Sequence, residues 1–68
     1  MEGIVRLRVH VRADGTVQRA DVVEDPGWGL GAAAREATSR FRFAPARNAE
    51  GRAVASVIRS YVFRFELR

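Results

Sequence analysis

The sequence contains no cysteine, which excludes disulfide bonds, thiolate chemistry and cysteine-containing zinc sites. It also contains no lysine, because all twelve basic residues are arginine. With eight acidic residues the net charge is +4. The use of arginine alone is typical of a GC-rich genome, and so small a charge, spread along the chain, is a weak signal for a polyanionic partner.

Long apolar runs are missing as well. No stretch approaches the roughly 18–20 apolar residues that span a bilayer. Residues 1–6 lack the charged start and apolar core of a signal peptide. The sequence therefore predicts either a cytoplasmic protein or a domain whose targeting segment lies elsewhere.

Groups suited to catalysis are few. His10 is the only histidine, and no carboxylate cluster stands at ligand spacing, so we predict no metal site. Ser39, Ser56 and Ser60 have only His10 as a candidate base, and neither a nucleophile elbow nor a lysine-containing phosphate loop is present. A domain of 68 residues also has a thin core with little room for a dry pocket. We therefore predict that the protein is not an enzyme and needs no cofactor.

Residues 4–12 alternate between apolar and polar side chains, the pattern of a strand with one buried face. The apolar set is Val5, Leu7, Val9 and Val11. Asp14 and Gly15 then predict a tight hairpin turn into a second strand over about residues 16–24. A bulge near Arg19 would place the apolar residues of that strand on one face.

A helix is predicted over residues 29–41, after Pro26 ends the second strand. Its apolar face is expected to be Leu30, Ala33, Ala34, Ala37 and Phe41. Residues 47–51 read as a polar loop, and residues 52–68 as a last strand. A slip of phase at Arg59 and Ser60 indicates a bulge or a bend there. Phe63 and Phe65 belong with the core phase of this strand.

The order β-β-α-β predicts one α+β domain over residues 1–68. The compact solution is a three-stranded antiparallel sheet in the order 2-1-3 with one helix on one face. Seventeen residues at about 3.3 Å each make the last strand about 56 Å long, against about 33 Å for the first. We therefore expect the last strand to overhang its neighbour, to bend or to find another partner.

Two surfaces are candidate binding sites. The last strand is an apolar edge, to which a peptide can add as a further strand through backbone hydrogen bonds. Alternatively, arginines such as Arg59 and Arg64 guard this edge and it has no partner. The second surface is the polar face of the first strand, with Arg6, Arg8 and Arg12, as a basic nucleic-acid-binding alternative. A sheet that reads RNA carries stacking aromatics on that face, so we expect a solvated face and no nucleic-acid partner.

Several stretches resemble the C-terminal domain of TonB-type energy transducers, and together they cover nearly the whole chain. They are Gly3-x-Val5-x-Leu7-x-Val9-x-Val11, Asp14-Gly15-Thr16-Val17, Ala20-x-Val22-Val23, Ala32-Ala33-Ala34, Arg40-Phe41-Arg42-Phe43-x-Pro45-Ala46, Gly51-x-x-Val54 and Phe63-x-Phe65-x-Leu67. Two features depart from the family pattern. Phe41 stands where the family often has tryptophan, and the short helix with a Tyr-Pro motif that usually precedes the first strand is missing.

The resemblance implies a periplasmic domain of an inner-membrane-anchored protein, with the anchor absent from this chain. Inner-membrane motor proteins would act through that missing N-terminal region. The implied partner is an outer-membrane TonB-dependent transporter, whose TonB box peptide adds as a strand beside the last strand. Arg59 and Tyr61 are the side chains most expected to touch the ligand. The predicted peptide-binding edge is Val54, Ser56, Val57, Ile58, Arg59, Ser60, Tyr61 and Val62.

Two alternatives keep this fold and change the partner. TonB-like domains also occur in other envelope-spanning machines, where the ligand is a periplasmic protein. The long last strand is also suited to self-association, with a homodimer formed by strand exchange.

Overall fold

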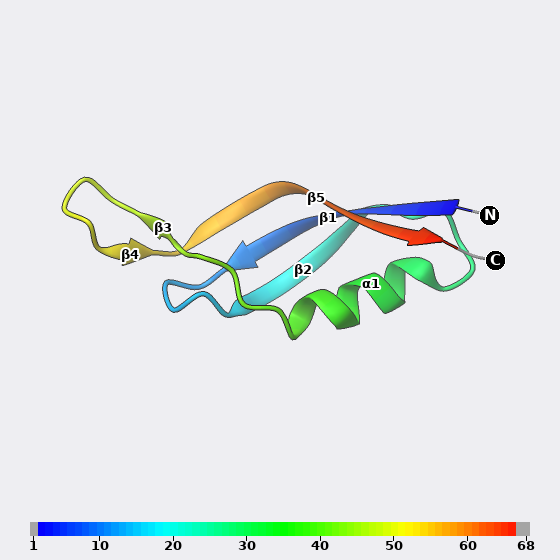
Figure 1. The fold of residues 1–68 in the computed structure, drawn as a ribbon, viewed down its shortest axis with the longest axis horizontal. Coiled ribbons are helices and arrows are strands. Elements are labelled where there is room, and N and C mark those ends of the chain that lie inside the picture. The colour runs from blue at the N-terminus through cyan, green and yellow to red at the C-terminus, as the bar shows by residue number, and fades with distance from the viewer. Residues whose placement is uncertain (1, 67–68) are drawn as a thin grey trace.

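The computed structural model describes residues 2–66 as a three-stranded antiparallel sheet, a short two-stranded sheet and one helix. In chain order the elements are β1 (Glu2–Val11), β2 (Val17–Glu24), α1 (Leu30–Ser39), β3 (Ala46–Arg47), β4 (Ala53–Val54) and β5 (Ser56–Glu66) (Figure 1). The main sheet has the order β2-β1-β5. The predicted α+β class and the central place of the first strand are therefore confirmed.

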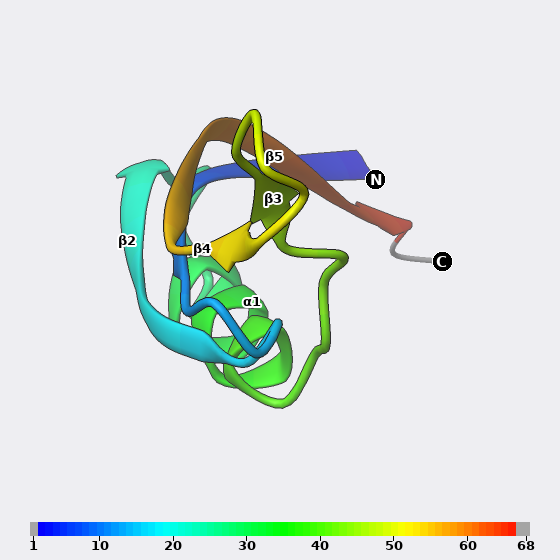
Figure 2. The ribbon, with the colours of Figure 1, turned by 90° about the vertical axis from the view of Figure 1, so that its left-hand side faces the viewer.

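The helix covers one face of the main sheet and packs mainly against β2 and β1. Seen end-on, the sheet arches over α1, and the segment from α1 to β3 passes along the open side of the arch (Figure 2). We call the face toward α1 the helix-side face and the opposite one the solvent-side face. Because α1 lies under β2 and β1, the helix-side face of β5 needs a different cover.

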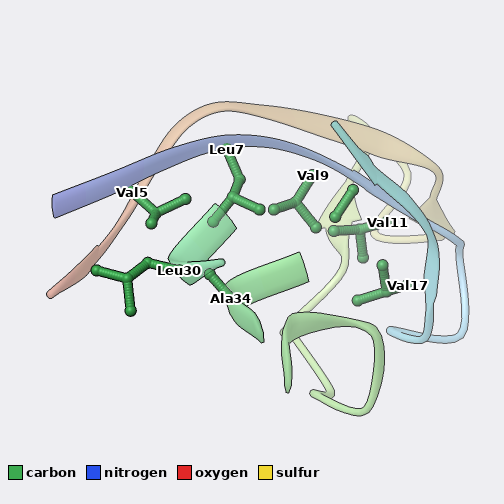
Figure 3. Close-up of a cluster of buried hydrophobic side chains, with 8 residues drawn as sticks. Val5, Leu7, Val9, Val11, Val17, Leu30 and Ala34 are labelled. Atoms are coloured by element: carbon green, nitrogen blue, oxygen red, sulfur yellow. The ribbon is translucent and has the colours of Figure 1, made fainter. Parts of the chain in front are cut away.

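The core is a single layer between β1 and α1 (Figure 3). Its fully or almost fully buried side chains are Val5, Leu7, Val9, Val11, Val17, Ala20, Leu30 and Ala34. Each buried valine or leucine stabilises the fold by about 1.5–3 kcal/mol relative to an exposed one. Gly3 helps to seal one end, since a Cβ there would lie 2.7 Å from Leu30 Cδ1.

The predicted helix face is partly wrong. Leu30 and Ala34 are buried as expected, but Ala33 is exposed and Thr38 is fully buried in its place. Apart from Gly31, which is also buried in the first turn, the buried stripe follows the i, i+4, i+8 row, and it is narrower than the predicted face because a ten-residue helix lies on only two strands. Phe41 lies beyond the helix, which ends at Ser39.

The β1–β2 turn has the predicted Asp-Gly chemistry. Arg12 N donates to Thr16 O at 2.8 Å, and Gly15, at φ 90°, donates its amide to Arg12 O at 2.9 Å. The Asp14 carboxylate accepts hydrogen bonds from the side chain of Thr16 at 2.6 Å and from its amide at 2.9 Å. These bonds favour the charged form and lower the pKa of Asp14.

Both outer strands of the main sheet, β2 and β5, contain bulges where they pair with β1. On β2 the register skips Gln18 beside the predicted position Arg19, and it skips Val23 as well. On β5 both Arg59 and Ser60 stand opposite Arg8. The bulges predicted near Arg19 and at Arg59 and Ser60 are confirmed, and β1 itself runs without interruption.

The predicted last strand is too long at its start. Residues 52–55 leave the main sheet, and β4 pairs instead with β3, so the expected polar loop is the turn of a projecting hairpin (Figure 1). Asn48 Oδ1 accepts the amides of Glu50 and Arg52 at 3.1 and 3.0 Å and closes this turn. β5 therefore has 11 residues against 10 in β1, and the expected mismatch in length disappears. Leu67 and Arg68, predicted as strand, lie outside the described residues.

Candidate binding edge

β5 is an outer strand of the main sheet. It pairs with β1 along its whole length, from Val11 opposite Ser56 to Gly3 opposite Phe65 and beyond. No other strand within residues 2–66 pairs with it, and no backbone hydrogen bond from a described loop reaches it. The side of β5 opposite β1 is therefore a free edge, with donors and acceptors open to a further strand.

The direction of these backbone groups follows from the β1–β2 turn. Residues along a strand alternate in the side to which they turn their backbone groups. Arg12 turns its amide toward Thr16, hence toward β2. Even-numbered residues of β1 therefore face β2, and odd-numbered residues, such as Val5 and Leu7, face β5.

The same alternation fixes the phase of β5. Val5 pairs with Phe63, so Phe63 turns its amide toward β1. Arg6 pairs with Val62, and its backbone groups face β2, so the amide and carbonyl of Val62 point to the free edge. Arg64 and Val57 share this phase, because each lies opposite an even-numbered residue of β1. A strand added to β5 would form its hydrogen bonds at these residues.

Five aromatic rings cover the helix-side face next to the free edge. Phe63 stacks on Phe65 at 5.0 Å between centroids, and Phe41 stacks on Phe63 at 6.2 Å. Phe43 meets Tyr61 edge-to-face at 5.4 Å. The three rings of β5 are only partly buried, and Phe41 is 36% exposed. This aromatic cluster (Phe41, Phe43, Tyr61, Phe63, Phe65) supplies the cover that α1 does not give, and it leaves apolar surface open beside the edge.

The solvent-side face carries the arginines that sequence analysis considered for nucleic acid. Arg12 Nη1 donates to Thr16 Oγ1 and to Val17 O, so this guanidinium is held against β2. Arg6 is half-buried, with Nη1 3.5 Å from Ser60 Oγ, and Arg8 is exposed. All the aromatic rings of β5 lie on the helix-side face, and none is available here to stack bases.

Few other side chains in the described residues are suited to metal binding or catalysis. His10 Nε2 lies 3.3 Å from Asp21 Oδ2, and Arg19 Nη2 lies 3.2 Å from the same oxygen. Among the side chains of residues 3–66 no group of three metal ligands and no enclosed pocket is found. No helix in this part of the chain is long and apolar enough to cross a membrane.

The predicted edge residues divide into three groups. Val54 lies in β4 and pairs with Ala46, so it belongs to the hairpin and not to the edge of the main sheet. Arg59 and Ser60 form the bulge. The others lie on regular parts of β5, with Ser56, Ile58 and Tyr61 on the helix-side face and Val57 and Val62 on the solvent-side face.

The predicted peptide-binding residues end at Val62, within a last strand that was predicted to run on to residue 68. The free edge continues through Phe63 and Arg64 to Glu66. The alternation of phenylalanine with charged residues at 63–66 was a usable signal for this continuation.

Taken together, the curved sheet, the single covering helix and the uncovered strand define a small sheet-and-helix domain with a free sheet edge. A family model described as the Gram-negative bacterial TonB protein C-terminal matches residues 1–67. The chain therefore belongs to the TonB C-terminal family, whose members are periplasmic protein-interaction domains of energy transduction to outer-membrane transporters. Neither the curated proteins nor the solved structures gave a match.

Proposed function

We propose that this domain binds the TonB box of an outer-membrane transporter by adding that extended segment as a strand to the free edge of β5. The observation that carries the proposal is the unpaired edge, where Val57, Val62 and Arg64 present backbone donors and acceptors. Strand addition takes its affinity from such bonds and its specificity from alternate side chains. The domain would act at the periplasmic end of a protein anchored in the inner membrane, and it would pass force from the motor proteins to the transporter.

The test is a titration of the ¹⁵N-labelled domain with a synthetic TonB-box peptide, followed by amide shifts. The expected result is a set of perturbations that follows β5, with little change along β2. A response confined to Arg6, Arg8 and Arg12 would contradict strand addition and favour a ligand of the solvent-side face.

Salt provides an independent check. Backbone pairing depends weakly on ionic strength, whereas binding through phosphate contacts weakens steeply with it. We expect the peptide affinity to change by less than about threefold between 50 and 200 mM salt, whereas a nucleic-acid complex would lose far more.

A further inference from the structure

We infer that the solvent-side face of the main sheet is a second protein-binding surface, and that it takes an amphipathic helix with a pair of carboxylates on one side. The site lies at the β5 bulge, where Arg6, Arg8 and Arg59 form an arginine cluster beside two exposed aliphatic side chains. It is separate from the free edge of β5, because it uses side chains on a face of the sheet and no unpaired backbone group.

The bulge places two arginines directly opposite each other. Arg59 and Ser60 both stand opposite Arg8 on the neighbouring strand. Arg59 and Ser60 are exposed, whereas Ile58 and Tyr61 on either side of them pack against the core. The bulge therefore turns both of its side chains to the solvent-side face, which Arg8 also occupies. Like charges in such a cross-strand position are destabilising, so this pair has a cost for the fold.

Arg6 adds a third guanidinium, and its donors are not all used. It lies two residues along β1 from Arg8, about 7 Å away on the same face. Its Nη1 is 3.5 Å from Ser60 Oγ, and its buried Nε has no hydrogen-bond partner among the described residues. Glu24 stands opposite Arg6 but forms no ion pair with it. The arginine cluster therefore has no carboxylate partner among the side chains of residues 3–66.

The nearest carboxylate on the other side of the cluster is already occupied. Asp21 stands opposite Arg8 on β2. Its Oδ2 lies 3.2 Å from both Nε and Nη2 of Arg19, and 3.3 Å from His10 Nε2. Asp21 therefore pairs with Arg19 and leaves the charges of Arg8 and Arg59 uncompensated. Negative charge from a ligand would relieve their repulsion.

Aliphatic surface lies beside the arginine cluster. Val62 stands opposite Arg6, and Ile4 is its diagonal neighbour on β1; the two side chains are 49% and 37% exposed. This face is the convex outer side of the arch, and no described helix or strand packs on it (Figure 2). Arginines next to exposed aliphatic residues are typical of protein interfaces. Nucleic acid would instead need stacking aromatics, so a protein is the partner that these residues fit.

The spacing of the arginines favours a helix as the ligand. The backbone of β1 is paired on both sides, so a ligand on this face is recognised through side chains alone. Residues i and i+4 of a helix lie about 6 Å apart, close to the distance of about 7 Å between alternate residues of a strand. Two glutamates at that spacing can accept charge-assisted hydrogen bonds from Arg6 and Arg8. Aliphatic residues on the same side of the helix would cover Val62 and Ile4.

The experiment uses a synthetic alanine-rich helix of about 18 residues, with glutamates at i and i+4 and leucines on the same side. The control peptide has the same composition, but its glutamates stand at i and i+2 and point to opposite sides. Titration of the ¹⁵N-labelled domain should perturb the amides of Arg6, Arg8, Ser60 and Val62. We expect the first peptide to bind about fivefold more tightly than the control. Equal affinities, or no response on this face, would overturn the inference.

Replacement of one arginine tests the cluster. Arg8→Gln should weaken binding of the helix by about fivefold, whereas Arg35→Gln, on the exposed side of α1, should change it by less than about twofold. Equal effects would show that net charge alone matters and would overturn the specific site. Since Arg8→Gln also removes the repulsion with Arg59, its melting temperature should be no lower than that of the original domain. A clearly lower value would contradict that repulsion.

The outcomes separate this inference from the proposed strand addition. Arg8→Gln should keep its affinity for a TonB-box peptide within about twofold, because that ligand is expected to use the backbone of β5. Parallel loss of both ligands in the folded variant would indicate one shared site and overturn the inference. A domain that binds the helix but no TonB-box peptide would contradict strand addition and leave the second surface standing. A single-stranded oligonucleotide that binds this face more tightly than the helix would overturn the protein partner.

Discussion

Phe41 lies parallel to Phe63, with their ring centroids 6.2 Å apart and their planes at 14°. This contact joins the segment after α1 to the edge strand, at the place where the helix no longer covers the sheet. The aromatic cluster therefore has two roles, because it completes the fold and forms one wall of the candidate binding edge.

Replacement of Phe41 should reveal its structural role. Phe41→Ala is expected to lower the free energy of unfolding by about 1–2 kcal/mol, less than for a fully buried phenylalanine because the ring is 36% exposed. Urea denaturation measures this change. Val23→Ala is the control, since Val23 is 53% exposed and should change stability by less than about 0.5 kcal/mol. Equal effects of the two substitutions would contradict the role of the stack.

Gly15 should tolerate a side chain less well than Gly51. Both residues have positive φ, 90° and 79°. A Cβ on Gly15 would collide with Phe43 O, whereas nothing lies within 4 Å of one on Gly51. We expect Gly51→Ala to cost about 1 kcal/mol from the backbone alone. Gly15→Ala should cost more, because it also disturbs the hydrogen bond of 2.9 Å from Phe43 N to Gly15 O. Thermal unfolding of both variants provides the comparison, and a larger effect at Gly51 would be inconsistent with the close approach at Gly15.

The buried hydroxyl of Thr38 predicts a stabilising substitution. Thr38 is fully buried, and its Oγ1 has no hydrogen-bond partner among the described residues. Thr38→Val keeps the shape and removes the unsatisfied polar atom, so the free energy of unfolding should rise by about 1 kcal/mol. Thr38→Ser, which keeps the hydroxyl and loses a methyl group, should be destabilising. A loss of stability in Thr38→Val, measured by urea denaturation, would contradict this account.

The hydrogen-bonded carboxylate of Asp14 in the β1–β2 turn predicts that the stability of the domain depends on pH. Hydrogen bonds from Thr16 lower the pKa of Asp14 in the folded protein, so the charged form stabilises the fold above the unfolded value of 3.8. This contribution is lost as the pH falls through the lower, folded pKa. Thr16→Val removes the first of these bonds and should move the pKa of Asp14 back toward 3.8. Carbon-detected NMR titration of the carboxyl group measures both values, and an unchanged pKa in Thr16→Val would contradict the assigned cause.

The sequence predicted the main sheet well, and for a clear reason. The alternation around Leu7 sets the buried face of β1, and the compact arrangement of the order β-β-α-β places this strand at the centre. The bulge at Arg59 and Ser60 was visible because side chains on either side of it change phase. The two-residue alternation is kept in β1 and broken in β5. In both strands the residues that show it are ones whose burial can be predicted from their side-chain type.

The hairpin and the exact helix face were beyond the sequence pattern. Residues 52–55 carry strand-forming side chains, and nothing in their alternation shows that β4 pairs with β3 and leaves β1. That choice depends on Asn48, which organises the turn, and on the anchoring of Phe43 N to Gly15 O. Thr38 was not predicted to be buried. On a helix made largely of small residues, a polar side chain does not indicate which face is buried.

Hydrogen exchange at the amides of β5 tests the central claim most directly. In the free domain the amides of Tyr61 and Phe63, bonded to β1, should exchange slowly, and those of Val62 and Arg64, turned to the free edge, should exchange fast. On addition of a TonB-box peptide, the amides of Val62 and Arg64 should become slow, while Tyr61 and Phe63 stay as they were. Amides of Val62 and Arg64 that are already slow without peptide, or that stay fast when it is bound, would contradict strand addition at this edge.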